Sequence, residues 1–139
     1  MLDKSDIKQQ IRATYSRGNM LISKFRKCSI DVKCKLFKAF CNNFYGGNLW
    51  SSYPKYAFLK LNRAYKRIFR QLFGIQNKED TSKFMLLYEI DFVEVIFRKL
   101  CSSLFFRILS SQNVLICNIV DSQFFYDSTI VQKWLKDIF

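Results

Sequence analysis

Apolar side chains recur at helical spacing along most of this chain of 139 residues, so the sequence predicts an all-α fold. In residues 3–27 one apolar stripe follows the period of a helix, and it consists of Ile7, Ile11, Tyr15, Ile22 and Phe25. Gly18 lies in the middle of this stripe, although a glycine inside a helix costs about 1 kcal/mol relative to alanine. We therefore predict that another backbone approaches the helix closely at Gly18.

A second helix is predicted over residues 30–45. Ser29 can serve as its N-cap, and the turn Gly46-Gly47-Asn48 marks its end. The predicted apolar face consists of Leu36, Phe37, Phe40 and Phe44. The opposite face carries Asp31, Lys35 and Lys38.

The third predicted helix has the clearest boundaries. Ser52 can cap it, Pro54 suits the first turn because its missing N–H costs nothing there, and the helix runs to Phe73 before Gly74 closes it. On a helical wheel, one arc of roughly 100° is apolar and an opposite arc of roughly 120° is cationic. The apolar arc holds Phe58, Leu61, Tyr65, Ile68, Phe69 and Leu72, and the cationic arc holds Lys60, Arg63, Lys66, Arg67 and Arg70.

The cationic arc has two explanations. Most charged runs on helices are solvated faces over a core, and this reading stays open for the third helix. However, its five cations have no Asp or Glu partner four residues away, so they repel one another instead of forming the usual ion pairs. Such a face favours contact with an external anion.

The rest of the chain is less sharply patterned. Residues 76–83 read as a polar linker, helices are expected near 83–110, and a terminal helix is expected over 129–138, capped by Ser128 or Thr129. Residues 113–120 are ambiguous between strand and helix, and the context favours helix. The sequence thus predicts a helical region at 1–75, a linker at 76–83 and a helical region at 84–139, although the length suits one compact domain.

Positive charge is concentrated in the first of these regions. Residues 1–75 hold 16 Lys and Arg against three acids, a net charge of +13, whereas residues 76–139 hold 7 against 8, a net charge of −1. A basic half beside a neutral half is typical of a surface that meets a polyanion. Nucleic acid is the first candidate partner and anionic lipid is the alternative.

Composition argues against most enzymes. The chain has no histidine and no Cys-x-x-Cys pair among its five cysteines, so neither a zinc site nor a serine or cysteine nucleophile with a histidine base is expected. No phosphate-binding glycine loop occurs, and we expect no cofactor. Charges interrupt the apolar region at 84–120, which argues against a membrane span, and the first ten residues lack the apolar core of a signal peptide. An intracellular protein is expected.

The order of residues on the predicted helices resembles the segment that follows the polymerase core in reverse transcriptases of non-LTR retrotransposons of the jockey type. The matching positions are Tyr15, Arg17, Gly18, Asn19, Leu21, Lys24, Phe25, Cys28, Asp31, Val32, Lys33, Leu36, Phe37, Phe40, Cys41, Tyr45, Leu49, Trp50, Ala64, Tyr65, Phe69, Arg70 and Gly74. Residues 110–139 are similar, more weakly, to the extreme C-terminus of the same proteins. Residues 76–95 carry the least resemblance.

The resemblance implies a small helical bundle of the thumb type with a helical C-terminal extension, the part that grips the template–primer duplex. The Asp-Asp pair of the catalytic palm occurs nowhere in this sequence, so we expect no metal site and no enzymatic activity of the chain on its own. Expected partners are RNA, DNA or RNA–DNA hybrid duplexes, bound through their backbones, and a polymerase palm or another protein. The expected nucleic-acid-binding residues are Lys60, Arg63, Lys66, Arg67 and Arg70, helped by Lys24, Arg26, Lys35 and Lys38.

Three alternatives to nucleic-acid binding are kept. The chain could be a helical protein–protein interaction module, because its 15 Phe, 7 Tyr and 2 Trp exceed what one small core easily buries. It could be a non-functional relic of a mobile element. A peripheral binder of anionic membranes is the least favoured reading.

Overall fold

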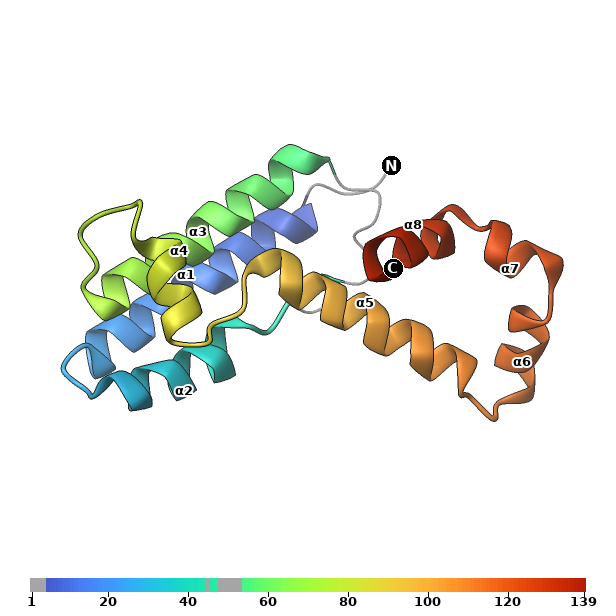
Figure 1. Ribbon diagram of the computed structural model, residues 1–139, viewed down its shortest axis with the longest axis horizontal. Coiled ribbons are helices and arrows are strands. Elements are labelled where there is room, and N and C mark those ends of the chain that lie inside the picture. Colours follow the sequence, from blue (N-terminus) through green and yellow to red (C-terminus); the bar gives the residue numbers. More distant parts are fainter. Residues whose placement is uncertain (1–4, 45, 48–53) are drawn as a thin grey trace. The chain divides into compact units, whose positions relative to one another are not determined.

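The computed structural model describes residues 5–44, 46, 47 and 54–139, and within these ranges the chain forms eight α-helices and no strand (Figure 1). The predicted all-α fold is therefore confirmed. The helices are α1 (Ser5–Phe25), α2 (Ile30–Cys41), α3 (Lys55–Phe73), α4 (Thr81–Leu87), α5 (Val93–Leu109), α6 (Val114–Val120), α7 (Gln123–Asp127) and α8 (Thr129–Ile138).

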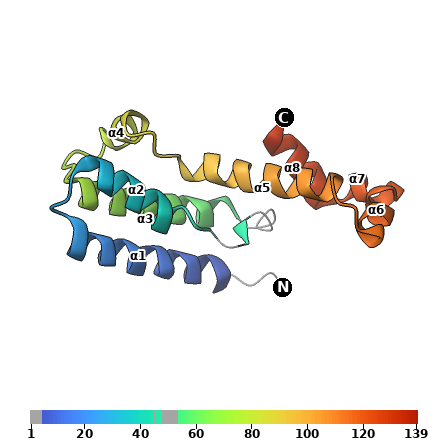
Figure 2. The ribbon, with the colours of Figure 1, turned by 90° about the horizontal axis from the view of Figure 1, so that it is seen from below.

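The chain divides into two compact units rather than the single domain that its length suggests. Within the described residues, the first unit holds α1 to α4 and the second holds Gly46, Gly47 and the chain from Glu94 onward. Residues 76–83, predicted as a linker, lie within the first unit, and the last three of them belong to α4. In the first unit α1 and α3 run in the same direction and α2 runs opposite to both (Figures 1 and 2).

Helix α3 supplies most of the core of the first unit. Its buried residues are Ala57, Leu61, Ala64, Tyr65, Ile68, Phe69 and Leu72. These include five of the six residues predicted for the apolar arc, and the sixth, Phe58, is half-buried. The amphipathic pattern of this helix alone thus identified the side that packs.

The ends of α3 agree with the prediction in part. Gly74 adopts the left-handed conformation with φ of 71°, and its N–H donates to the Arg70 carbonyl, as a glycine C-cap does. Pro54, however, is the N-cap residue and precedes the first turn, which begins at Lys55. The predicted cap Ser52 lies outside the described residues.

The buried line of α1 differs from the predicted stripe. It runs through Ile7, Thr14, Gly18 and Leu21, whereas Ile11, Tyr15, Ile22 and Phe25 are only half-buried. The Thr14 hydroxyl donates to the Gln10 carbonyl at 2.7 Å, and this bond compensates for the burial of a polar group. A helical wheel that ranks positions by apolar character alone could not predict that a threonine and a glycine lie at the centre of the buried face.

Helix α2 also departs from its predicted boundaries and face. It ends at Cys41, before the glycine turn, and Ser29 occupies the N-cap position without a side-chain capping bond. Phe37 is fully buried, but Phe40 is 41% exposed, so the predicted placement of Phe40 in the core is wrong. Cys41, four residues after Phe37, is buried on the helix face where Phe40 was expected.

Aromatic rings join the helices of the first unit. The Phe37 ring of α2 lies 5.0 Å from that of Tyr65 and 5.5 Å from that of Phe69, both on α3. Phe73 stacks on Tyr88, which follows α4, with ring centroids 5.2 Å apart. The Tyr65 hydroxyl lies 2.7 Å from Asn42 Oδ1 and 3.1 Å from the Asp91 carbonyl, so it is hydrogen-bonded although its ring is buried.

The second unit has a smaller core and an exposed apolar surface. Its core consists of Cys101, Phe105, Phe125, Val131 and Trp134. Residues 114–120 form α6, which agrees with the helix favoured for 113–120, and the Asn113 side chain caps it by accepting from the Leu115 N–H at 2.9 Å. Ser128 is the N-cap residue of α8 but makes no side-chain capping bond.

Helix α6 buries none of its residues. The exposed apolar side chains on α6 and α7 include Val114, Leu115, Ile119 and Phe124, and the last of these is 83% exposed. We call these four residues the α6–α7 apolar patch. Across the described ranges, no single helix is long and apolar enough to cross a membrane. Helices α5 and α6 have the required length and apolar character only when taken together, and they are bent by 107° relative to each other.

Candidate nucleic-acid interface

The cations of α3 lie on the side of the helix that faces away from its buried residues. Lys60, Arg63 and Arg67 are exposed, and Lys66 and Arg70 are half-buried. The sequence of α3 contains no Asp or Glu, so none of these charges is neutralised from within the helix. The helix therefore presents a positive face over most of its length.

Two of the five cations, Lys60 and Lys66, contact side chains of their own unit. The Lys60 ammonium group lies 5.6 Å from the centroid of the Tyr56 ring. The Lys66 ammonium group lies 5.5 Å from the centroid of the Phe92 ring and, in addition, 3.5 Å from Ser82 Oγ. A cation held over an aromatic face is partly compensated. We therefore expect Lys66 to contribute less to an external anion than Arg63 or Arg67.

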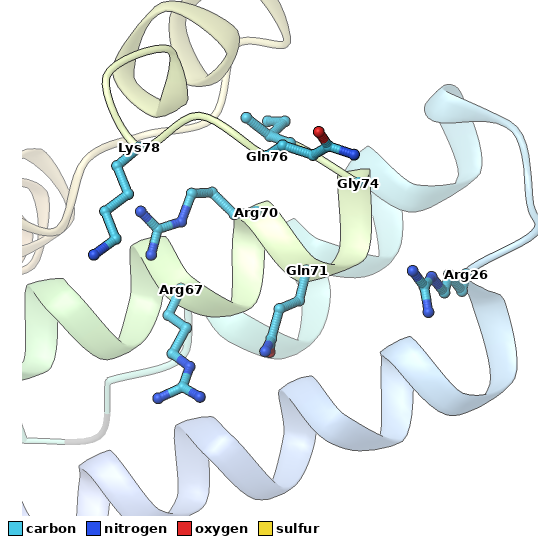
Figure 3. Close-up of a pocket in the computed structure, with 8 residues that line it drawn as sticks. Arg26, Arg67, Arg70, Gln71, Gly74, Gln76 and Lys78 are labelled. Atoms are coloured by element: carbon cyan, nitrogen blue, oxygen red, sulfur yellow. The ribbon is translucent and has the colours of Figure 1, made fainter.

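The last turns of α3 border a hollow of about 360 Å³ (Figure 3). We call it the C-terminal hollow, and its lining residues are Arg26, Arg67, Arg70, Gln71, Gly74, Ile75, Gln76 and Lys78. Arg26 follows the end of α1, Arg67 and Arg70 come from α3, and Lys78 lies in the segment between α3 and α4. Three segments of the first unit thus bring four positive charges around one cavity.

Lys78 was absent from the predicted set. It lies four residues beyond the glycine that ends α3, in a stretch whose sequence reads as a polar linker. Its place beside Arg70 depends on the left-handed turn at Gly74, which directs the chain back along the helix end (Figure 3). The Gly74 signal was visible in the sequence, but the course of the chain beyond it was not.

Within the part of the chain that the structure describes, no acidic residue lines the C-terminal hollow. Among the described residues, the side chains of Arg26, Arg67, Arg70 and Lys78 form no hydrogen bond or ion pair with one another or with a neighbour. The negative end of the α3 dipole lies nearby and offsets part of this charge. This negative end is weakened because the Arg70 carbonyl accepts hydrogen bonds from the N–H groups of both Gly74 and Ile75.

The structure separates the other predicted cations from this hollow. Lys24, Lys35 and Lys38 are exposed on α1 and α2, and none of them lines it. Lys60 instead lines a second hollow of about 260 Å³ near the start of α3, where Lys8 of α1 joins it. Of the four helper residues, only Arg26 is brought together with cations of α3.

Arg17, in contrast, ties the first unit together. Its Nε donates to the Ala13 carbonyl and its Nη1 donates to the Asn43 carbonyl, each at 3.2 Å. This side chain connects α1 to the segment that follows α2. It therefore has a structural role that its positive charge alone would not reveal.

Buried ionisable groups do not add charge to the interface at neutral pH. Burial raises the pKa of the Cys41 thiol to about 12, an effect that the positive charge of Arg17 partly opposes. Burial also raises the pKa of the Tyr65 hydroxyl above its ordinary value. Within the described ranges, no three His, Cys, Asp or Glu residues are grouped so that they could hold a metal ion.

Comparisons with protein-family models, with curated proteins and with solved structures gave no match to this chain.

Proposed function

We propose that the first unit binds a nucleic-acid duplex through its phosphate backbone. The observation that carries this proposal is the row of exposed cations on α3, Lys60, Arg63 and Arg67, in a helix without any acid. Like charges at helical spacing destabilise an isolated helix, and a polyanion relieves that repulsion. A solvated face would instead be expected to mix both signs of charge.

Backbone contacts explain why the surface is built from lysine and arginine. Phosphate contacts supply affinity and position the protein, whereas sequence is recognised at base edges. The cationic face is the outer side of a helix packed on its own unit, a geometry suited to lying along a phosphate strand. RNA, DNA and RNA–DNA hybrid duplexes all present such a strand.

The ordered resemblance of residues 15–74 supports an origin in the reverse transcriptase of a non-LTR retrotransposon. In this proposal the first unit corresponds to the thumb and the second unit to the C-terminal extension. The sequence in hand holds no Asp-Asp pair, so the proposed role is duplex binding without polymerisation. We place the protein inside the cell, where a reducing environment maintains thiols, and all five of its cysteines are free.

A fluorescence titration with an RNA–DNA hybrid at several salt concentrations tests the binding proposal. If Lys60, Arg63, Arg67 and Arg70 each neutralise one phosphate, log K falls against log salt with a slope of about −3.6. Anionic lipid vesicles are the control, because a membrane binder would prefer them to the hybrid. Absence of binding at low salt, or affinity independent of salt, would contradict the proposal.

Protein–protein contact is the second candidate function, and the α6–α7 apolar patch favours it. Exposed contiguous apolar surface is typical of interaction sites. A second copy of the chain is the partner that the purified protein can test. Sedimentation at increasing protein concentration should show association that Leu115→Ser with Phe124→Ser abolishes, and a monomer at all concentrations would contradict self-association.

A further inference from the structure

We propose that the C-terminal hollow binds a terminal phosphate, the phosphomonoester at a strand end of nucleic acid. This inference rests on the proposed duplex binding and assigns a separate task to one part of the basic surface. Lys60 and Arg63 would contact backbone phosphates along the strand, whereas Arg70 and Lys78 would hold its end.

The arrangement of charge in the hollow is the first reason. Its cations come from α1, from α3 and from the segment after Gly74, and Arg70 and Lys78 lie side by side, whereas Arg67 and Arg26 lie apart from them (Figure 3). Bringing like charges together across three segments costs free energy in the absence of an anion. Among the described residues the lining contains no acid, so an anion from outside the unit would relieve this repulsion.

The chemistry of a strand end is the second reason. An internal phosphodiester carries one negative charge and is covered by sugars on both sides. A phosphomonoester carries a charge of about −1.5 to −2 at pH 7 and exposes three acceptor oxygens. A concave site therefore gains more from a monoester, which protrudes from the strand and can be surrounded by donors.

The donors of the hollow suit such a group. Arg67 and Arg70 offer guanidinium forks, which match phosphate oxygens in bidentate geometry, and Lys78 adds an ammonium group. The amides of Gln71 and Gln76 provide further donors on the same lining. The N–H groups of Gly74 and Ile75 are already bonded to Arg70, so recognition depends on these side chains.

The test compares three blunt hybrid duplexes of identical sequence, with a 5′-phosphate, a 3′-phosphate or only hydroxyl groups at the ends. Fluorescence titration of the full chain should give about tenfold tighter binding to a phosphate-ended duplex, the gain expected from a charge-assisted hydrogen bond. The two phosphorylated duplexes show which strand end the hollow prefers. Equal affinity for all three would overturn the inference while leaving duplex binding intact.

Variants locate the effect. Arg70→Gln with Lys78→Gln should remove the preference for phosphate ends, whereas its binding to the hydroxyl-ended duplex should weaken only by the single backbone contact that Arg70 makes. Arg12→Gln with Lys55→Gln is the matched control, because it removes the same charge from exposed sites in the first unit outside the hollow. Lys78→Gln alone serves if the double variant loses its helical circular dichroism.

The outcomes separate the two proposals. Loss of the preference in both double variants would mean that net charge, and not the hollow, sets it, and this would overturn the inference. Failure of the unmodified chain to bind any duplex would overturn the proposed function together with the inference. A preference that only the hollow variants lose would support both.

Discussion

Gly18 of α1 lies directly against Ile68 of α3. A Cβ atom added to Gly18 would be 2.5 Å from Cγ2 of Ile68, which is closer than real Cβ contacts allow. Ile68 is fully buried, so its side chain lies within the core of the first unit. The predicted close approach at Gly18 is thus present. The group that approaches is the Ile68 side chain, however, and not the backbone that was predicted.

Gly18→Ala is therefore expected to destabilise the first unit. Alanine gains up to about 1 kcal/mol of helix propensity, but overpacking against a buried side chain costs about 1–3 kcal/mol. Urea unfolding measures the net change, and Ser16→Ala, at an exposed position of α1, is the control for propensity alone. Adding Ile68→Ala should make the cost of Gly18→Ala smaller, because the new methyl group then has space. A stabilising Gly18→Ala would contradict the packing described here.

Phe69→Ala should lower the free energy of unfolding by about 3–5 kcal/mol. Phe69 is fully buried between the rings of Phe37 and Phe73, with centroids at 5.5 Å and 4.5 Å. Phe40→Ala is the matched control, since Phe40 is 41% exposed and its removal should cost within about 0.5 kcal/mol. Chemical denaturation of the two variants checks that Phe69 is buried and Phe40 exposed. Equal losses of unfolding free energy would show that the Phe40 side of α2 is buried instead.

Alkaline pH should destabilise the first unit through Cys41 and Tyr65. Burial raises the pKa of Cys41 from its ordinary 9.0 to about 12, so the folded chain keeps a proton that the unfolded chain releases. The raised pKa of Tyr65 acts in the same direction at higher pH. The stabilisation is complete below pH 9.0 and is lost as pH rises toward about 12, with a slope of up to about 1.4 kcal/mol per pH unit and group.

Urea unfolding of the native chain and of Cys41→Ala across this range measures the effect. The variant cannot release a proton at this position, so the difference in stability between the two proteins should shrink as pH rises. Other titrating groups occur in both proteins and cancel in the difference. A difference that stays constant with pH would exclude the thiol as the cause.

Lys60→Gln with Arg63→Gln should make the salt dependence of duplex binding less steep by about 1.8 units of slope, since two phosphate contacts are lost. Glutamine is a good helix former, so α3 should persist. Arg107→Gln with Lys136→Gln removes the same charge from exposed sites of the second unit and should change the slope less. Equal changes in both variants would reduce the attraction to an effect of net charge.

We expect no DNA synthesis by this chain with any template, primer or divalent metal. Polymerisation requires carboxylates that hold catalytic metal ions, and the sequence has no Asp-Asp pair. A primer-extension assay against a mock preparation is the measurement. Extension above the mock level would refute this expectation.

The sequence by itself determined the all-α class of the fold and the side on which the amphipathic helix α3 packs. Apolar spacing and the Gly74 cap depend on neighbours within about one turn, so α3 and its buried arc could be predicted from local pattern. The same applies to α8, whose bounds, Thr129–Ile138, are those predicted. The concentration of cations on α3 is also a property of sequence alone.

Only the tertiary structure decided which side chains meet. Cys41 instead of Phe40 enters the core because α2 packs through a narrow face, and a shift of one position turns a side chain by about 100°. The C-terminal hollow likewise needs Arg26 and Lys78, which are 52 residues apart, to reach the end of α3 together. Such contacts depend on how separate helices pack and how the chain turns after Gly74, and no local periodicity encodes them.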